Sequence, residues 1–345
     1  MNLLFRIMLF FLLPLPLLAQ QPSPTPPAPT TVQLNVTVTG HSGKPVSGLI
    51  QSNFTVLDIG SPQPILRFHA VQSPSSDPPV QIILLIDTVN ASLPTVAYER
   101  DQIVQLLRKS GPTFPYPLSF IFFSDTGTEI QQAPSNNTTT LLANLEQQVT
   151  KLRTIHRSSG FYGAAERQQL SLKTLGQITD LEQKIPGRKL LIWISPGWPY
   201  LTGPRIDLSA RDARGLFSSV VGLSTALQHA DITLYSVDPV GVAGTDEFRT
   251  TYYESFLKGV TSPRDVQSGN IALQVLAQHT GGKVLNSGND IAGEIAACIE
   301  DASAFYVLTV PRAPSDSADK FHAIEVKLSE TKLKARTLNG YYAQP

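Results

Sequence analysis

The spacing of hydrophobic residues changes along the chain, and each change marks a different kind of structure. In residues 32–38, Val and Leu alternate with Gln, Asn and Thr, which is the period of a half-buried strand. Turn residues then separate this segment from two further short strands, 54–58 and 65–71. We therefore expect a small β module over residues 32–72.

After a Pro/Ser-rich stretch, the pattern changes to that of an α/β domain. Residues 80–86 form a continuous apolar run, as expected of a strand buried on both faces. Helical and strand patterns then alternate to residue 310, which predicts a doubly wound, mostly parallel sheet covered by helices over 80–310. The expected helices are 96–108, 141–152, 163–183, 210–230, 271–279 and 291–304, and the expected strands 118–123, 190–194, 232–237, 283–285 and 305–310.

The last segment, residues 311–345, returns to strand patterns at 321–328 and 333–342. We expect these strands to pair with the N-terminal β unit. The predicted fold class is therefore α/β, with a doubly wound mostly parallel sheet and a small β module built from both ends of the chain.

The first residues have the pattern of a secretory signal peptide over 1–20. Arg6 precedes an apolar run at 7–18, and Ala19 ends that run with a small residue. The alternative is a membrane anchor, but the run is well short of the roughly 20 residues that span hydrocarbon. A Pro-rich tether follows at 21–31. We expect export to the periplasm or the extracellular space, with no membrane span in the mature chain.

Composition narrows the choice of partner. Lys plus Arg and Asp plus Glu each number 27 in 345 residues, so the formal net charge is zero and no global charge favours nucleic acid. Cys298 is the single cysteine, which excludes an intramolecular disulfide. We expect it to be a small buried residue on a helix.

The segment Ile86-Asp87-Thr88 resembles the end of the first strand of a von Willebrand factor type A domain. Other segments resemble a secreted bacterial branch of that family, known chiefly from Acidobacteria, and together they cover nearly all of residues 31–342. The resemblance implies the α/β fold expected above and a protein ligand at the carboxyl ends of the parallel strands. The segments that carry it are 36–49 with 53–58, 186–197, 276–282 and 339–342.

The same resemblance implies a Mg²⁺ or Mn²⁺ site, which this sequence departs from. The family holds the ion through Asp-x-Ser-x-Ser, a Thr on a second loop and an Asp on a third; all are oxygen ligands, which hard cations prefer. The matching positions here are Asp87, Val89 and Ala91, then Pro196 on the third loop, with Ser135 or Thr138 as candidates for the second. We therefore predict a degenerate site with no cofactor; weak binding of Mg²⁺ or Mn²⁺ at Asp87 is the alternative.

Polar and aromatic residues near these loops are the candidate binding residues. Aromatic side chains with a polar group are common anchors of protein interfaces, although they could equally form a lid over the sheet edge. In the insertion after residue 240, we favour a short helix that packs its own aromatics. The candidates are Thr88, Asn90, Ser92, Ser195, Trp198 and Tyr200, with Phe248, Tyr252, Tyr253 and Phe256 in the insertion.

We predict an adhesion-type protein–protein interaction function and no enzymatic activity. The chain contains no G-x-S-x-G, phosphate-loop or H-E-x-x-H motif. One alternative is a hydrolase using the strand-end carboxylates Asp87, Asp125 and Asp238, which would need to lie in one pocket. Another is a structural envelope component without a dedicated ligand.

Overall fold

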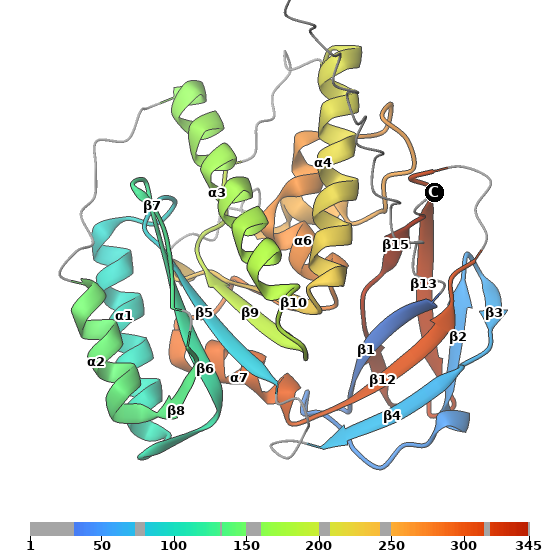
Figure 1. Ribbon diagram of the computed structural model, residues 1–345, viewed down its shortest axis with the longest axis horizontal. Coiled ribbons are helices and arrows are strands. Elements are labelled where there is room, and N and C mark those ends of the chain that lie inside the picture. The colour runs from blue at the N-terminus through green and yellow to red at the C-terminus, as the bar shows by residue number, and fades with distance from the viewer. Residues whose placement is uncertain are drawn as a thin grey trace, which may run out of the picture.

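The computed structural model describes residues 31–72, 80–131, 133–149, 160–199, 208–241, 250–313 and 318–343. The predicted signal peptide lies outside these residues, as does the predicted tether except for Thr31. Figure 1 shows an α/β unit beside a β module that lies at the lower right of the view.

Among the described residues, seven strands form the central sheet, in the order β11-β10-β9-β5-β6-β7 with β8 also paired to β6. The five strands from β11 to β6 are parallel, whereas β7 and β8 are antiparallel to β6. The bounds are β5 (Gln81–Asp87), β6 (Thr113–Ser124), β7 (Gly127–Ile130), β8 (Ser135–Asn137), β9 (Lys189–Ile194), β10 (Ile232–Val237) and β11 (Val284–Leu285).

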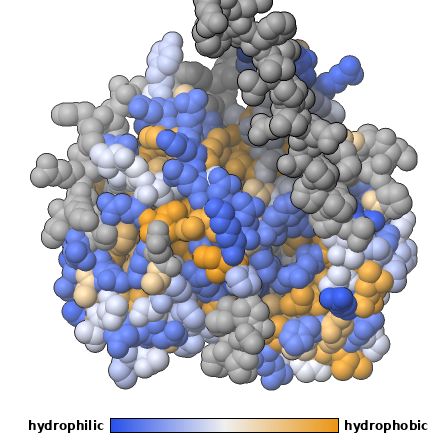
Figure 2. Space-filling view, in the orientation of Figure 1, coloured by the Kyte–Doolittle hydropathy of each residue, from blue (hydrophilic) through white to orange (hydrophobic). Residues whose placement is uncertain are grey.

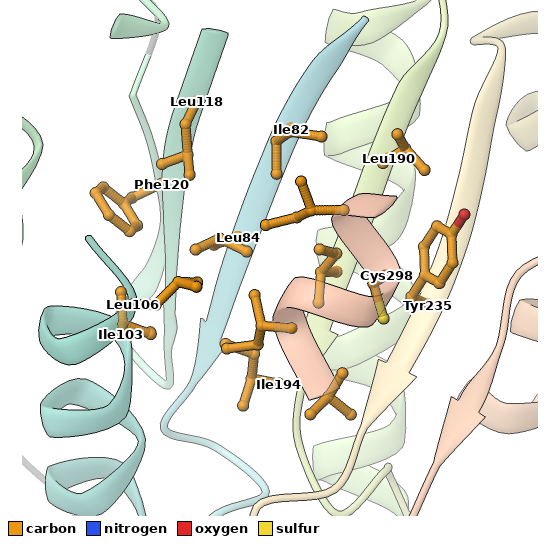
Figure 3. Close-up of a cluster of buried hydrophobic side chains, with 14 of the residues drawn as sticks. Ile82, Leu84, Ile103, Leu106, Leu118, Phe120, Leu190, Ile194, Tyr235 and Cys298 are labelled. Atoms are coloured by element: carbon orange, nitrogen blue, oxygen red, sulfur yellow. The ribbon is translucent and has the colours of Figure 1, made fainter. Parts of the chain in front are cut away.

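Helices cover both faces of this sheet, which explains why its central strands are apolar throughout. On one face lie α1 (Leu93–Lys109), α2 (Thr138–Val149) and α7 (Ile291–Ile299). On the other lie α3 (Gly160–Glu182), α4 (Ala210–His229) and α6 (Leu273–His279). Figure 3 shows the core beneath α1 and α7, where Cys298 is fully buried as expected. None of the described helices is long and apolar enough to cross a membrane.

The β module consists of two four-stranded antiparallel sheets that enclose a third core. One has the order β14-β1-β12-β4 and the other β15-β13-β2-β3, so each sheet contains strands from both ends of the chain, and these alternate in the first sheet. The predicted fold class is therefore confirmed. The bounds are β1 (Thr31–Thr39), β2 (Phe54–Asp58), β3 (Ser61–Gln63), β4 (Arg67–Gln72), β12 (Ala304–Pro311), β13 (Phe321–Leu328), β14 (Lys334–Arg336) and β15 (Gly340–Tyr342).

The expectation that 305–310 continues the alternating series is wrong, because β12 joins the β module between β1 and β4. Tyr306, Leu308 and Val310 point into the module core, whereas Phe305 packs into the core beneath α1 and α7. The strand is thus apolar on both faces because it contacts two different cores. A buried strand of the parallel sheet would have the same sequence pattern.

An ionic network joins the α/β unit to the β module at Asp301, which lies on the short 3₁₀ helix η5 (Glu300–Ala302) and is fully buried. Its Oδ1 accepts from Lys283 Nζ at 3.0 Å, and its Oδ2 accepts from Tyr235 Oη at 2.8 Å and from Arg336 Nη2 at 2.5 Å. Burial alone would raise the pKa of Asp301, but Arg336 and Lys283 outweigh it and lower that pKa. Because Arg336 belongs to β14, the network fixes the module against the sheet.

Candidate functional site

Asp87 ends β5 at the carboxyl edge of the sheet and is fully buried. Its Oδ1 accepts from the backbone amides of Val89 and Asn90, each at 2.9 Å. Its Oδ2 accepts from Asn90 Nδ2 at 2.8 Å and from Trp193 Nε1 at 3.0 Å. Four donors from the chain itself therefore surround this carboxylate.

The turn after Asp87 uses its apolar residues for packing. Val89 and Ala91 are both buried, Val89 in the core beneath α3 and α6 and Ala91 in the core beneath α1. Ser92 then caps α1, because its Oγ accepts from Thr95 N at 3.3 Å. Val89 and Ala91 occupy the positions at which the von Willebrand factor type A family has hydroxyl side chains. Here they stabilise the loop by packing into the cores on the two faces of the sheet.

The other candidates on this loop and on the loop after β9 make local bonds. Thr88 donates its Oγ1 hydrogen to Phe123 O at 2.9 Å. Asn90 also donates to Ser171 Oγ on α3 at 3.0 Å. Ser195 is fully buried and accepts from Gly197 N at 3.1 Å. Of these predicted binding residues, Ser92 is exposed and Asn90 is half-buried.

Trp198 is buried, so its side chain is not available at the surface for the binding role predicted for it. It is 2% exposed and donates its Nε1 hydrogen to Ile271 O at 2.7 Å. Its ring packs edge-on against Trp193, with centroids 5.1 Å apart. The physical reason is that its indole covers the end of the sheet and finds a buried acceptor there, so the lid interpretation holds. Tyr200 lies outside the described residues.

Neither Ser135 nor Thr138 can complete a metal site at Asp87. Ser135 pairs with Leu118, and Leu118 pairs with Ile82, five residues before Asp87 on β5. At about 3.3 Å per residue, this places Ser135 roughly 16 Å from the carboxyl end of the strand. Thr138 donates its backbone amide to Pro112 O, just before β6. Both residues therefore lie toward the opposite edge of the sheet.

The residues at Asp87 do not fit a divalent cation. The carboxylate is already saturated by NH donors, Val89 and Ala91 supply no side-chain oxygen, and Pro196 has no side-chain ligand. Within the described parts of the chain, no group of three or more His, Cys, Asp or Glu side chains is arranged to hold a metal ion. No metal-dependent step is therefore derived for this site.

Glu99, on the buried face of α1, is a second acidic group near Asp87 that the sequence pattern did not single out. It is fully buried, and neither of its carboxyl oxygens has a hydrogen-bond partner among the described residues. Burial raises its pKa well above the usual value, and the charges of Asp87 and Asp238 raise that pKa further. Burial and the two neighbouring carboxylates therefore favour the protonated form of Glu99. Its signal in the sequence was one acidic residue in the apolar stripe of an amphipathic helix.

The three carboxylates of the hydrolase alternative differ in exposure. Asp87 and Asp238 are buried, whereas Asp125 is exposed in the turn between β6 and β7.

In the insertion, Tyr252–Phe256 forms a short 3₁₀ helix, η3, in which Tyr253 and Phe256 are buried. Tyr252 and Phe256 pack on each other with centroids 5.1 Å apart, as favoured above, and Phe248 lies outside the described residues.

Four of the eight exposed large apolar side chains of the described residues lie at or near the starts of helices on this edge. In a parallel α/β sheet the helices run opposite to the strands, so the N-termini of α1, α3 and α4 lie at the carboxyl edge. Leu93 and Tyr98 on α1 are 47% and 40% exposed, Tyr162 on α3 is 85% exposed, and Leu208 before α4 is 37% exposed. We call these four residues the apical apolar set. Sequence patterning missed them because three lie in the first two turns of helices and Leu208 lies just before α4, away from the residues that directly follow the strands.

No protein family matches the chain by sequence, and no curated protein sequence does. Among solved structures it is similar to the manganese-loaded TRAP protein of Plasmodium vivax (TM-score 0.37, 12% identity, 81% of this chain and 96% of that one). It is also similar to the pilus adhesin SpaC from Lactobacillus rhamnosus GG (TM-score 0.40, 9% identity, 87% and 49%). A third is the proximal thread matrix protein 1 of the mussel byssus with a zinc-occupied MIDAS motif (TM-score 0.34, 10% identity, 69% and 48%). The chain spans about half the length of the last two.

Proposed function

We propose that the chain is an exported, non-enzymatic binding module that recognises a protein partner through the carboxyl edge of its parallel sheet, without a metal ion. The observation that carries the proposal is the apical apolar set. Four of the exposed large apolar side chains in the described parts of the chain lie at the starts of three helices on this one edge. Exposed leucine and tyrosine side chains that share one edge are typical of a protein contact surface.

The export part of the proposal is supported by the sequence of residues 1–20. A basic residue, a short apolar run and a small-residue exit are the features of a signal peptide. The absence of a second cysteine is compatible with export, since the fold is held by three packed cores.

Metal independence is supported by the bonds of Asp87. A cation would have to displace four NH donors, two of which come from the backbone of the same turn. Trp193 Nε1 would then be left buried without an acceptor, at a cost of about 1–3 kcal/mol. A partner that uses apolar contact needs no such rearrangement.

The apical surface is tested by crosslinking in the native host, followed by identification and quantification of the captured protein. Replacing both Leu93 and Tyr162 by Ser should reduce capture at least about tenfold, the equivalent of 1.4 kcal/mol. Ile50→Ser is the matched control, because Ile50 is 63% exposed on the β module. Equal thermal unfolding of all variants verifies the fold. Equal capture by the double variant and the wild type would rule out this surface.

The metal-independent part has its own measurement. Calorimetric titration of Mg²⁺ or Mn²⁺ into the mature protein should give no saturable uptake, and capture should persist in EDTA. Micromolar uptake, or loss of the partner on chelation, would overturn this part while leaving the surface assignment to be judged by the variants.

A further inference from the structure

A pocket lies between the α/β unit and the β module, at the edge of the sheet opposite to the apical apolar set. Its walls come from the C-terminal ends of α4 and α6, the start of β10, and strands β1, β13 and β15. Figure 1 shows these helices and strands on the two sides of the junction. The pocket contains about 610 Å³ of empty space with its open mouth included. Junctions of this kind are common positions for small-molecule sites.

One side chain with a carboxylate lines the pocket, and no lysine or arginine does. Asp231 contributes this carboxylate from the turn between α4 and β10. Its Oδ1 accepts from Asn35 Nδ2 on β1 at 2.5 Å, which leaves Oδ2 without a bond among the described residues. Lys189 interacts electrostatically with Asp231, but its ammonium donates to the backbone carbonyls of Glu182, Ile185 and Ala230.

Three further oxygens in the wall lack a donor. Asn35 Oδ1, Ser224 Oγ and Asn339 Oδ1 are buried and have no hydrogen-bond partner within the described residues. Most buried polar groups in folded proteins are paired, so several unpaired oxygens around one pocket indicate a missing donor. A bound molecule that brings N–H or O–H groups would supply it.

The rest of the wall combines the polar side chains of Gln33, Gln228, Thr233 and Thr280 with apolar side chains, and none of these carries a positive charge. Leu227, Leu276 and Leu338 line it together with the Phe321 ring. His279 also lines the pocket, and its Nε2 donates to Leu257 O at 3.1 Å. Burial lowers the pKa of His279, and this effect outweighs the hydrogen bond to Leu257, so the ring is neutral at pH 7. A cation entering the pocket therefore meets no like charge from the lining side chains, and the Lys189 ammonium, which interacts with Asp231, is held outside the lining by three backbone carbonyls.

We propose that this pocket binds a small primary ammonium ion with a short apolar body. The ammonium has three N–H donors and no acceptor, which suits a wall of one carboxylate and several unpaired oxygens. Charge-assisted bonds to Asp231 would hold the head, and the apolar body would lie against the leucines. This site is independent of the apical surface, because it lies at the other edge of the sheet.

The test uses the intact mature protein and three probes of equal length: n-butylammonium, butan-1-ol and butyrate. Calorimetry or chemical-shift titration should show saturable binding of n-butylammonium, at least about tenfold tighter than butan-1-ol. Butyrate should not bind, since its charge would oppose that of Asp231. Comparable affinities for the alcohol and the ammonium, or no saturable binding because the pocket holds only ordered water, would overturn the proposal.

Variants separate the pocket from nonspecific binding at the surface. Asp231→Asn keeps the side-chain volume and an acceptor for Asn35, and Asn tolerates the positive φ of 54° found at this position. It should weaken n-butylammonium binding about tenfold. Asp101→Asn, which alters an exposed carboxylate on α1, should leave the affinity unchanged. Ser224→Leu should fill the pocket from within α4 and abolish binding. Retained affinity in both pocket variants would refute the site.

Discussion

Replacing Asp301 by Ala should lower the free energy of unfolding and weaken the attachment of the β module to the α/β unit. The side chain is fully buried and is shared by Lys283, Tyr235 and Arg336, which come from three different segments of the chain. Its removal leaves two cations facing a cavity of side-chain size and an unpaired tyrosine hydroxyl. The variant loses the group that joins these segments.

The expected cost follows from the burial of the partners. Breaking a buried ion pair by removing one member costs about 3–5 kcal/mol, since the remaining charge is uncompensated. The Lys283 and Arg336 side chains are each 23% exposed, so water recovers part of their solvation and the lower end, about 3 kcal/mol, applies. At roughly 2 °C per kcal/mol for a chain of this size, the melting temperature should fall by about 6 °C.

The measurement is thermal and urea unfolding of Asp301→Ala beside Asp101→Ala, an exposed acidic residue on α1 that serves as control. Limited proteolysis should cleave the Asp301 variant within the β module before the α/β unit. A double-mutant cycle with Arg336→Ala isolates the pair, and its coupling energy should exceed about 1 kcal/mol.

The pH dependence gives a second criterion. Because the folded-state pKa of Asp301 is lowered, its stabilisation is complete above the unfolded pKa of about 3.9 and is lost as pH falls through the folded value. The deficit of the variant should therefore shrink below about pH 4. A loss under 1 kcal/mol at neutral pH, or a deficit that does not change on acidification, would refute the reasoning.

Three further changes test the interior. Asp87→Ala should destabilise the protein by about 3 kcal/mol, because four NH donors lose a buried acceptor, and should alter the fluorescence of Trp193; unchanged stability in urea would contradict this. Glu99→Gln should become more stable than the wild type as pH rises above about 4.3, the pKa of an unperturbed glutamate. Only the folded wild type must keep a proton that its unfolded chain releases. Parallel curves of unfolding free energy against pH for the two proteins would contradict this. Tyr341→Phe removes the 2.7 Å bond to Asp58 and should cost about 1–3 kcal/mol by urea unfolding, and a cost near zero would show that Asp58 is satisfied without it.

Much of the fold could be predicted because the periodicities are strong. The apolar run of β5 indicates a strand buried on both faces, and the alternation of β1 indicates a half-buried strand. The position of β12 could not be predicted, because a strand between two cores has the same residue pattern as a strand inside a parallel sheet. The edge strand β7 is too short and polar to produce a signal.

The position of Asp87 at the end of β5 was predictable, but its hydrogen bonds were not. The replacements at positions 89 and 91 indicated a degenerate loop, and the buried packing of both side chains gives the physical reason. That Trp193 supplies a donor to Asp87 could not be foreseen, because it depends on the register of β9 beside β5. The exposure of Tyr162 depends on which way the first turn of α3 faces, which spacing alone leaves open.

Figure 2 shows apolar side chains over the lower right of the molecule, where the β module lies in Figure 1. This module has a consequence for the order of folding. β1 pairs with β12 and β14, so the first described strand to be synthesised waits for partners about 270 to 300 residues later in the chain. Contacts of such high sequence separation form slowly. The α/β unit can thus collapse while β1 and β4 are unpaired and β2 is paired only with β3, so the two sheets of the β module are completed last.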